Sequence, residues 1–509
     1  MARIGQGRAP AVSDPYYITT AINYPNGPPH IGHAYEAIAA DVIARFQRSQ
    51  GRDVRFQTGT DEHGLKMAQA ARAEGVDPAQ YADKMSSLFR EMDDFLDISC
   101  DRFIRTSEPE HHRASQAIWA AMAEKGDLYL DRYEGWYSVR DEAFYDESEL
   151  TAGEGGSKLS PQGTPVEWTA EESWFFRLAA YQNKLLDLYR TNPGFIRPES
   201  RRNEVVRFVE GGLSDLSISR TSFDWGVKVP GSDNHVMYVW LDALTNYLTG
   251  LGYPQDSELM RRFWPADVHL IGKDVVRFHA VYWPAFLMSA GIELPKQVYG
   301  HGFILSRGGE KMSKSVGNVV DPVVLAERFG VDQLRYFLMR EVPFGQDGSY
   351  SAEAIVNRVN AELANSFGNL AQRTLSMVFK NLDGDIPAAG KAPEDIALLE
   401  TVRAACEKDV PSEFERFAFA SGLEAWMGAV FACNAYVDAA APWALRKTDP
   451  ERMAEVLGTL VEAILLLTRV VEPVIPASAA KLLDFIGKEA RIGQPEPIFP
   501  RLELDEAPE

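Results

Sequence analysis

Cysteine is scarce in this sequence. The 509 residues include three cysteines, Cys100, Cys406 and Cys433, which are odd in number and far apart. A disulfide framework needs paired cysteines and a four-cysteine zinc site needs two close pairs, so this spacing excludes both. Positive charge is also in short supply, because 52 basic residues against 73 acidic ones give a net charge of −21. That balance argues against a general coat for nucleic acid but leaves room for a local basic patch.

Long uninterrupted hydrophobic runs are missing as well. The opening segment, MARIGQGRAPAVSD, lacks the apolar core of a signal peptide. The most apolar late stretch, VLGTLVEAILLLTRVVEPVI, is interrupted by Glu462, Arg469 and Glu472, which favours a buried helix over a membrane span. We therefore expect a cytoplasmic protein that does not bind membranes. A hydrophobic content of 45% is ample for a folded chain of two to four domains.

The first part of the chain has the pattern of an α/β fold. Residues 16–22 (YYITTAI) predict a buried parallel strand, and NYPNGPP then breaks the chain. Apolar residues at helical spacing predict a helix from Ile31 to about Gly51, followed by a strand in DVRFQTGTDEHG and a helix over 65–74. Residues 267–291 repeat the order of strand, turn and helix. This order predicts a doubly wound α/β domain with a parallel sheet.

Two other regions differ from this pattern in composition and periodicity. Residues 128–176 combine short aromatic strands with a Gly/Ser/Pro segment and predict a small β-containing insertion, followed by a helical stretch to about residue 222. From about residue 355 onward nearly every segment has helical periodicity. We expect this last region to form a helical bundle.

Two histidines stand just past the first Pro/Gly-rich turn. His30 and His33 lie at the start of the predicted helix, where free amide groups and the helix dipole favour anions. Imidazoles at positions i and i+3 share one side of the first turn, and each can donate a hydrogen bond to a phosphate oxygen. Taken alone, such a pair is more often a capping or surface feature.

A second candidate is the segment LSRGGEKMSKSVGN (305–318). Its lysines, Lys311 and Lys314, are spaced i and i+3 among serines and glycines. A small polar loop of this kind could fold its ammonium groups onto a polyphosphate. Considered singly, it is equally a solvated loop between helices.

Together the two segments resemble the paired signatures of class I aminoacyl-tRNA synthetases, HIGH and KMSKS. Further segments resemble the methionyl-tRNA synthetases: AINYPNG, GTDEHG, YVWLDALTNY, IGKDVVRFHAVYWPA, NLAQRT and APW. The resemblance extends from Tyr17 to about Phe485. It implies a Rossmann-like doubly wound parallel sheet split by a small connective insertion, followed by an all-α anticodon-binding helical bundle.

The resemblance also suggests how the chain is divided. We expect a flexible N-terminus (1–14), two halves of the catalytic domain (15–118 and 223–300) and a connective insertion between them (119–222). A KMSKS loop and stem-contact region (301–355) and a helical anticodon-binding domain (356–509) would follow.

The implied reaction is that of a methionine–tRNA ligase. L-methionine and ATP with Mg²⁺ would give methionyl-adenylate and pyrophosphate, and the methionyl group would pass to the 3′ end of tRNA(Met), including the initiator. We expect Mg²⁺ to be held mainly by the phosphates. Because no dimerisation module follows residue 509, we expect a monomer.

The resemblance assigns roles in ATP binding. His30 and His33 would hold the phosphates in the transition state, and Lys311 and Lys314 would neutralise the leaving pyrophosphate. Asp274 would accept hydrogen bonds from the ribose, although an ordinary N-cap is an equal alternative. The implied ATP-binding residues are Gly32, Gly272, Asp274, Lys311, Ser313 and Lys314.

The resemblance also implies an aromatic methionine pocket, which suits a polarizable thioether. Asp61 would bind the substrate ammonium. The other implied pocket residues are Ile22, Tyr24, Trp240, Leu244, Tyr247, Val275, His279 and Trp283. By spacing alone the aromatic members would be core residues and His279 a satisfied core histidine. Leu244 stands where the family commonly has proline.

Many members of the family carry a zinc knuckle in the insertion. Here Ser138 and Asp141 stand where cysteines would be, and Ser160 has no cysteine or histidine nearby. Zinc needs about four such ligands in tetrahedral geometry, so we expect no zinc. We expect packing to hold this knuckle instead, through Tyr133, Trp136, Tyr137 and Phe144.

Three residues of the helical region are implied to read the anticodon. Unstacked RNA bases are typically bound by stacking on aromatic rings and by hydrogen bonds to their edges. Trp443 would stack a base, and Asn369 and Arg373, one helical turn apart, would bind its edges. Without the family these are a packing anchor and a solvated helix face. Nearby positive charge would come from Lys380, Arg446 and Lys447.

Other functions remain open at this point. A nucleotidyltransferase that adenylates a small acid would share both signatures, but the helical tail argues against it. A catalytically silent RNA-binding paralogue is disfavoured by the intact histidines and lysines, and a cysteinyl enzyme by the missing zinc ligands. The insertion is too short for an editing domain, which disfavours isoleucine, leucine and valine enzymes.

Overall fold

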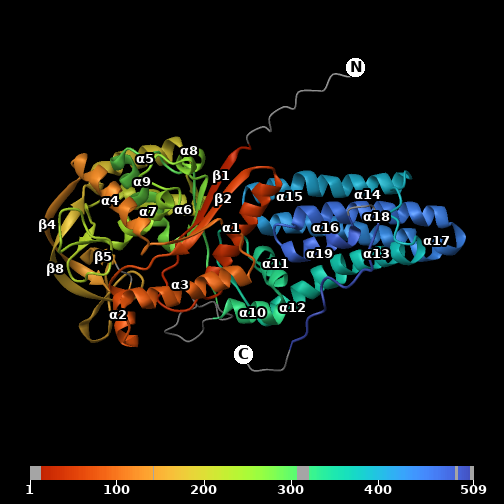
Figure 1. Cartoon of the computed structure of the whole chain (residues 1–509), viewed down its shortest axis with the longest axis horizontal. Coiled ribbons are helices and arrows are strands. Elements are labelled where there is room, and N and C mark those ends of the chain that lie inside the picture. Colours follow the sequence, from red (N-terminus) through yellow and green to blue (C-terminus); the bar gives the residue numbers. More distant parts are fainter. Residues whose placement is uncertain (1–12, 141–142, 306–319, 488–490, 505–509) are drawn as a thin grey trace, which may run out of the picture. The chain divides into compact units, whose positions relative to one another are not determined.

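The computed structural model describes residues 13–140, 143–305, 320–487 and 491–504. They fall into two compact units (Figure 1). The first draws on Met1–Pro29, Gln47–Asp94 and Ile98–His301, and the second on His30–Phe46, Phe95–Asp97 and Gly302–Glu509. The second unit therefore includes an early segment of the chain, which carries His30 and His33.

A six-stranded sheet with the order β3–β2–β1–β13–β14–β9 forms the centre of the first unit. All neighbouring strands in it are parallel. The strands are β1 (Pro15–Thr20), β2 (Asp53–Thr60), β3 (Arg102–Arg105), β9 (Ile196–Arg197), β13 (Val268–Gly272) and β14 (Val298–His301). The strand order reverses at β1, which lies between β2 and β13, and in such sheets this is the usual place for a ligand.

Helices outside the insertion complete the first unit. They are α2 (Leu65–Glu74), α3 (Pro78–Phe95), α4 (Pro109–Glu124), α7 (Val239–Thr249), α8 (Glu258–Phe263) and α9 (Trp283–Ala290). Short turns η4 (Lys273–Val275) and η5 (Phe278–Tyr282) precede α9. One core cluster of the unit includes Trp283, Phe286 and Leu241, all nearly inaccessible to solvent. The predicted helix over 65–74 has the same bounds as α2.

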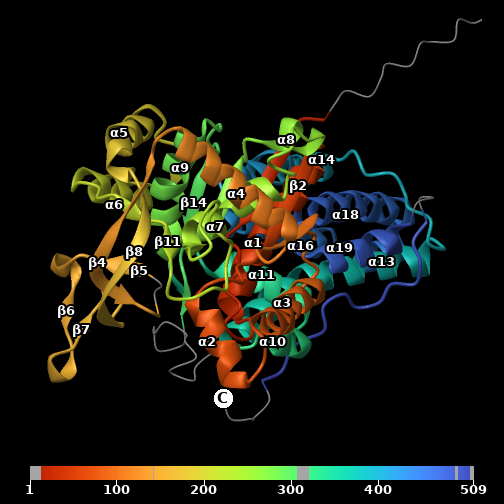
Figure 2. The same ribbon diagram turned by 60° about the vertical axis from the view of Figure 1, so that its left-hand side comes forward.

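The insertion is built on a long antiparallel hairpin of β4 (Leu128–Ser138) and β8 (Pro165–Phe176). Short strands β5 (Ala143–Tyr145), β6 (Thr151–Ala152) and β7 (Lys158–Leu159) complete its sheet, and Figure 2 shows β6 and β7 at the far end of the hairpin. Turns η1 (Glu147–Glu149) and η2 (Glu154–Gly156) connect these strands, and η3 (Leu178–Tyr181), α5 (Gln182–Thr191) and α6 (Glu199–Glu210) follow. Strands β10 (Leu216–Ser217), β11 (Ser219–Arg220) and β12 (Val236–Met237) lead back toward α7.

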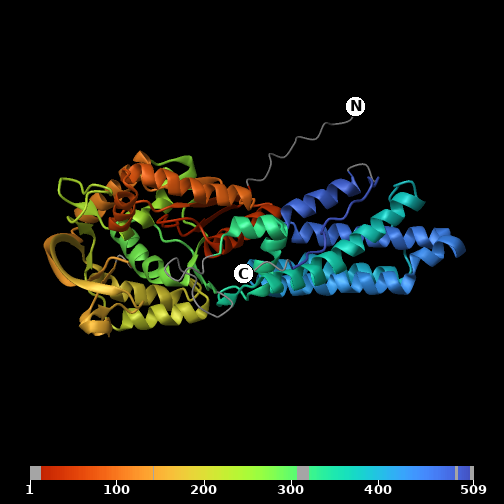
Figure 3. The same ribbon diagram turned by 90° about the horizontal axis from the view of Figure 1, so that it is seen from below.

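The second unit is mainly helical. It begins with α1 (Ile31–Ser49), of which residues up to Phe46 belong to this unit. The later elements are β15 (Ile304–Leu305), α10 (Pro322–Phe329), α11 (Val331–Glu341), β16 (Gly348–Ser349), α12 (Ala352–Arg358), η6 (Val359–Gly368), α13 (Asn369–Asn381), α14 (Pro393–Ala404), η7 (Ala405–Asp409), α15 (Val410–Glu415), α16 (Phe419–Ala440), α17 (Pro442–Thr448), α18 (Pro450–Val471) and α19 (Pro476–Ile486). The long helices of this unit run side by side in Figure 3.

The predicted fold class is confirmed: a parallel sheet interrupted by an antiparallel insertion and followed by a helical region. The apolar stretch near residue 460 is the core of α18, whose inner face includes Leu457, Leu460 and Ile464. Among the described residues, no helix is long and apolar enough to cross a bilayer.

Candidate active site

The carboxyl ends of β1 and β2 bring two predicted methionine-binding segments together. Beyond β1, the Asn23 amide donates to the Gly59 carbonyl oxygen at 2.8 Å, and the Asp61 amide donates to the Asn23 carbonyl oxygen at 2.8 Å. The segment with Ile22 and Tyr24 therefore lies beside Asp61, which is buried. Parallel strands end at one edge of their sheet, so this neighbourhood follows directly from the topology.

Four aromatic rings form a cluster next to β13. Tyr247 of α7 stacks on His269 with ring centroids 4.0 Å apart, and its ring lies 6.0 Å from that of Trp283. The Tyr247 hydroxyl and His279 Nε2 are 2.6 Å apart. The structure thus brings together Tyr247, His279 and Trp283 as predicted, and it adds His269, which the sequence did not single out.

Hydrogen bonds fix the proton positions on both imidazoles of the cluster. Burial lowers the pKa of His279 to about 4, and although its hydrogen bond to the Val275 carbonyl oxygen opposes this, the ring is neutral near pH 7. His279 Nδ1 must donate to that carbonyl oxygen at 2.9 Å, so Nε2 accepts the Tyr247 hydroxyl proton. Burial also lowers the pKa of His269, whose Nε2 accepts from Trp283 Nε1 at 3.3 Å.

The remaining predicted pocket residues lie around this cluster. Trp240 stacks on Phe278 with ring centroids 3.6 Å apart and planes inclined by 10°. Both rings line a cavity of about 180 Å³ on the side of the insertion. Leu244 is fully buried in the core of the unit, and Val275 packs against the same core. Phe278 was missed by the sequence analysis, although its position directly before His279 was a signal for it.

A polar network supports the turn that carries Asp61. The Asp242 carboxylate accepts from His63 Nδ1 at 2.6 Å and from His111 Nε2 at 2.7 Å, and all three side chains are buried. Burial alone would raise the pKa of Asp242, but the charge of His63 and the hydrogen bonds from His111 and His63 outweigh it, so the pKa lies below its usual range. Asp242 therefore stays ionised and anchors α7 to the turn of Asp61.

The turn after β13 carries Gly272 and Asp274. Gly272 caps the short turn η4, so Asp274 lies inside the turn and is not its N-cap. A Cβ on Gly272 would lie 2.7 Å from Asp274 Oδ1, so any side chain there would displace this carboxylate. The glycine therefore leaves room for this position of the carboxylate, and the exposed side chain of Asp274 lies at the carboxyl edge of the sheet.

In the second unit, His30 and His33 lie at the start of α1 with their rings stacked at a centroid distance of 3.8 Å. His33 Nδ1 accepts from the His30 amide and His30 Nδ1 accepts from the Gly32 amide, both at 3.1 Å. A neutral imidazole that accepts at Nδ1 carries its proton on Nε2, the donor that a phosphate oxygen requires. A Cβ on Gly32 would lie 2.9 Å from His30 Cε1, so glycine permits this arrangement.

The lysines of the second signature, Lys311 and Lys314, and the neighbouring Ser313 lie outside the described residues. The residue that follows that segment is placed. The amide of Ile31, the first residue of α1, donates to the Val320 carbonyl oxygen at 3.0 Å. The chain therefore returns from the KMSKS segment directly beside His30.

The predicted knuckle holds a cluster of hydroxyl groups. Thr164 Oγ1 lies 2.6 Å from Ser138 Oγ and 2.8 Å from Ser160 Oγ, and the three side chains are buried. Ser138 and Ser160 are the positions at which the family resemblance implies zinc ligands. Hydroxyls do not replace thiolates on zinc, so these residues do not fit the metal. Asp141 lies outside the described residues, and in the described part of the chain no cluster of His, Cys, Asp and Glu could hold a metal.

Of the predicted packing residues of the insertion, Trp136 and Tyr137 have described side chains. Trp136 and Trp168 meet edge to face with centroids 5.3 Å apart, and Lys158 Nζ lies 4.2 Å from the Trp136 ring centroid. Tyr137 is buried. The side chains of Tyr133 and Phe144 are not among those described.

The three predicted anticodon-binding residues lie on α13 and α17. Asn369 and Arg373 are exposed on α13, and the Arg373 guanidinium lies 5.3 Å from the ring centroid of Trp443. Trp443 is 46% exposed, which leaves a large aromatic face in contact with solvent. Lys380, Arg446 and Lys447 are also exposed. An exposed aromatic ring beside a guanidinium is suited to stacking a base.

Comparison with known proteins gives two family matches. The family "tRNA synthetases class I (M)" matches residues 16–375, and the "Anticodon binding domain of methionyl tRNA ligase" matches residues 386–500. The chain belongs to the methionyl-tRNA synthetases. Its activity is that of an aminoacyl-tRNA ligase for methionine, as the family resemblance predicted. Membership in this family sets aside the cysteinyl enzyme and the adenylating enzyme without RNA.

Relatives of this methionyl-tRNA synthetase are similar over nearly their whole length. The methionine–tRNA ligase of Brucella suis biovar 1 (strain 1330) is 58% identical, with 96% of this chain and 99% of that protein covered. The crystal structure of Mycobacterium tuberculosis methionyl-tRNA synthetase bound by methionyl-adenylate is 56% identical, with a TM-score of 0.93 over 96% of this chain and 100% of that one. The free form of the same enzyme has a TM-score of 0.87, covering 98% and 100% of the two chains at 51% identity.

Proposed function

We propose that the chain joins L-methionine to tRNA(Met), the initiator included, in two steps. The methionine carboxylate attacks the α-phosphorus of ATP, which forms a carboxyl–phosphate bond and breaks the bond to the leaving pyrophosphate. A hydroxyl of the terminal tRNA ribose then attacks the carbonyl carbon, and AMP leaves. One observation carries the proposal: Asp61 and Gly272–Asp274 lie at the carboxyl ends of β2 and β13, the two strands that flank β1, and the aromatic cluster packs on His269 of the same β13. The Mycobacterium tuberculosis relative is bound by methionyl-adenylate, the product of this first step.

Methionine recognition would rest on one charge and on a wall of the pocket formed by the aromatic rings of Tyr247, His279 and Trp283. We assign Asp61 to the substrate ammonium, because it lies beside the segment with Ile22 and Tyr24. The thioether would lie against Trp240, Leu244, Tyr247, Val275, His279 and Trp283. The neutral His279 supports this assignment, since a charged imidazole would oppose the burial of an apolar side chain.

ATP recognition would use groups from two parts of the chain. We assign Asp274 to the ribose hydroxyls, with Gly272 giving the nucleotide close access to the backbone. His30 and His33, with Gly32 between them, would donate to the phosphates as charge develops there. We keep Lys311, Ser313 and Lys314 as the groups that neutralise pyrophosphate, on the strength of their motif and of the contact between Ile31 and Val320. Mg²⁺ would arrive with ATP, bound mainly by phosphate oxygens.

The helical bundle would supply the tRNA contact. We assign Trp443 to stacking on an anticodon base and Asn369 and Arg373 to its hydrogen-bonding edges. The match of residues 386–500 to an anticodon-binding family and the exposure of these side chains support this. Because ribosomes consume the product, we place the enzyme in the cytoplasm.

The test is exchange of labelled pyrophosphate into ATP without tRNA, run with all twenty amino acids in parallel. We expect strong exchange with methionine alone, and its loss in Lys314→Ala. Exchange with another amino acid would keep the adenylate chemistry but overturn the pocket assignment. If no amino acid supports exchange, the proposed first step is wrong.

A further inference from the structure

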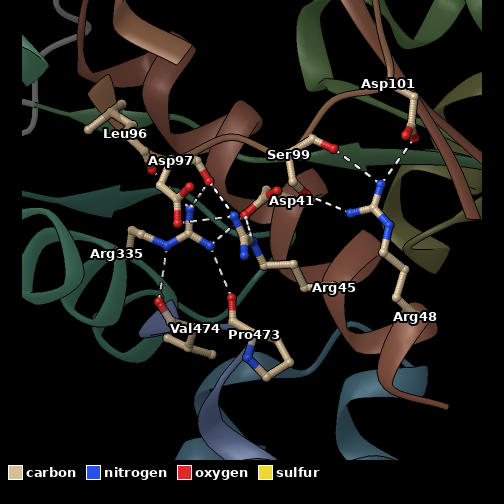
Figure 4. A network of polar contacts seen from close by, with 10 residues as sticks. All are labelled: Asp41, Arg45, Arg48, Leu96, Asp97, Ser99, Asp101, Arg335, Pro473 and Val474. Atoms are coloured by element: carbon tan, nitrogen blue, oxygen red, sulfur yellow. Dashed lines mark hydrogen bonds and ion pairs between the residues drawn. The ribbon is translucent and has the colours of Figure 1, made fainter. Parts of the chain in front are cut away.

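One guanidinium in the second unit is completely inaccessible to solvent. Arg335 of α11 and its partner Asp41 of α1 are both 0% exposed at the side chain, and Arg335 Nη2 lies 2.6 Å from Asp41 Oδ2 (Figure 4). The two residues are 294 positions apart in the sequence. Neither touches the candidate pocket residues among the contacts described above, so the active-site chemistry does not account for this pair.

Arg335 also binds the backbone of two further segments. Its Nε donates to the Val474 carbonyl oxygen at 3.1 Å and Nη2 to that of Pro473 at 3.0 Å. Its Nη1 donates to the carbonyl oxygens of Leu96 at 3.1 Å and Asp97 at 3.4 Å. All three nitrogens of the planar fork are thus used, a pattern that the single ammonium of lysine cannot reproduce.

This buried ion pair is better explained by its effect on the positions of the helices than by a gain in the free energy of unfolding. Removing two charges from water costs free energy, and packed apolar side chains of the same volume often stabilise a fold as well or better. What the buried group adds is a specific arrangement, because every buried donor must meet an acceptor; Asp41 Oδ2 also accepts from Arg45 Nε at 2.7 Å. Here that arrangement fixes the position of α1 against α11 and the 473–474 segment.

The segments that meet at Arg335 are continuous with, or packed against, helices that carry proposed functional residues. Asp41 lies about 15 Å along α1 from its first residue, so its position sets that of His30 and His33 at the start of the same rigid helix. On the other side, Pro473 and Val474 directly follow α18, which packs against both α13 and α17. These two helices carry Asn369, Arg373 and Trp443.

We propose that Arg335 is a positioning residue for the reaction: it holds the phosphate-binding end of α1 in place against the helices that carry the anticodon-binding residues. The inference rests on the proposed role of His30 and His33. A displaced α1 would misalign the donors to the transition state but leave the methionine pocket, which lies in the other unit, unchanged.

The main test is Arg335→Lys, which keeps the charge beside Asp41 but loses the fork. We expect kcat for pyrophosphate exchange to fall about tenfold or more, because small misplacements of catalytic groups are costly. The methionine dissociation constant, followed by tryptophan fluorescence, should stay within about twofold. A residue that only supports the fold would change neither quantity at a temperature well below the unfolding midpoint, or both together.

Arg48→Gln is the matched control. Arg48 lies on the same helix and donates to Ser99 Oγ at 2.6 Å and to Asp101 Oδ2 at 3.0 Å, two residues of the first unit, and its side chain is partly exposed (Figure 4). We expect its kcat to stay near that of the wild type. Asp41→Asn provides a second variant, which keeps an acceptor for Arg335 and should reproduce the fall in kcat if Arg335→Lys does not fold.

The outcomes separate the two proposals. If His30→Ala retains full exchange, the phosphate role and this inference both fail. If His30→Ala is inactive but Arg335→Lys and Asp41→Asn behave like Arg48→Gln, only this inference is overturned. Equal losses of methionine affinity and kcat would also overturn it, since the effect would then be a general loss of structure.

Discussion

At the scale of residues, the candidate pocket is defined by which atoms carry protons. Tyr247 and Trp283 donate to neutral histidines, His279 and His269, whose other nitrogens are bonded in turn to Val275 and Thr19. Each ring is therefore held by a hydrogen bond as well as by packing. A wall of this kind keeps its shape without its ligand, which reduces the entropy lost on binding.

Tyr247→Phe tests this wall. The change removes the donor to His279 Nε2 and leaves this nitrogen as a buried acceptor without a hydrogen bond. An unsatisfied group of this kind costs about 1–3 kcal/mol of free energy. We expect the KM for methionine in pyrophosphate exchange to rise about tenfold, with a smaller change in kcat. Tyr129→Phe removes a comparable hydroxyl, which donates to Asp215 at 2.9 Å in the insertion, and should leave this KM unchanged. An unaltered KM in Tyr247→Phe would remove Tyr247 from the pocket.

Sequence reasoning assigned the candidate pocket residues through family motifs but could not predict which side chains they contact. His269 lies within a buried strand and Phe278 within the same short motif as His279, so both could have been suspected. The pairing of Arg335 with Asp41 could not, because a side-chain contact across 294 positions leaves no local pattern in one sequence. Such contacts follow from tertiary packing and not from periodicity.

At the scale of elements, the insertion has buried hydroxyl groups at the positions where the family resemblance implies zinc ligands. Ser138 at the end of β4, Thr164 and Ser160 form a buried cluster that ties β4 to the residues just before β8. A zinc site would supply much of the folding free energy of a small module. The hydroxyl cluster supplies less, so the hairpin depends on the length of its strands and on aromatic packing.

We expect two results from this element. A zinc chelator should leave the thermal midpoint and the exchange activity unchanged when Mg²⁺ is kept in excess. Ser138→Ala should lower the free energy of unfolding by about 1–2 kcal/mol, because Thr164 loses a buried partner. Ser87→Ala, which removes an exposed hydroxyl on α3, is the control. Loss of a bound metal with loss of activity would contradict the assignment of the knuckle.

The sequence predicted the elements with a clear periodic spacing of apolar residues better than it predicted the short elements. The start of α1 at Ile31 and both ends of α2 were confirmed, because a long apolar stripe and clear breakers define them. β9, with residues Ile196–Arg197, joins the edge of the parallel sheet although its surroundings are helical. Two residues are too few for a period, and their pairing with β14 depends on the completed sheet.

At the scale of the whole molecule, neutral histidines make stability depend on pH. Burial lowers the pKa of His279 and of His112 to about 4, and it also lowers that of His269. Between the ordinary value of about 6.5 and about 4, the unfolded chain binds protons that the folded chain does not. The free energy of unfolding must therefore fall as the pH drops through this window.

For His279 alone we expect a loss of about 2 kcal/mol between pH 7 and pH 5. Urea unfolding followed by tryptophan fluorescence at the two pH values measures it. His279→Gln cannot take up a proton in this range, so its stability should depend less on pH by about that amount. An equal pH dependence in both proteins would show that His279 is already charged in the folded state.

The path of α1 has a consequence for any attempt to divide this chain. Residues His30–Phe46 belong to the helical unit, where Tyr35 faces Phe344, Phe46 meets Phe414 and Asp41 meets Arg335. The residues on either side of this segment belong to the first unit. A fragment that ends after β14 would carry this helix with its buried side uncovered. The complementary fragment would lack a helix from its own core. The gene therefore cannot be cut into two independent modules at any single point.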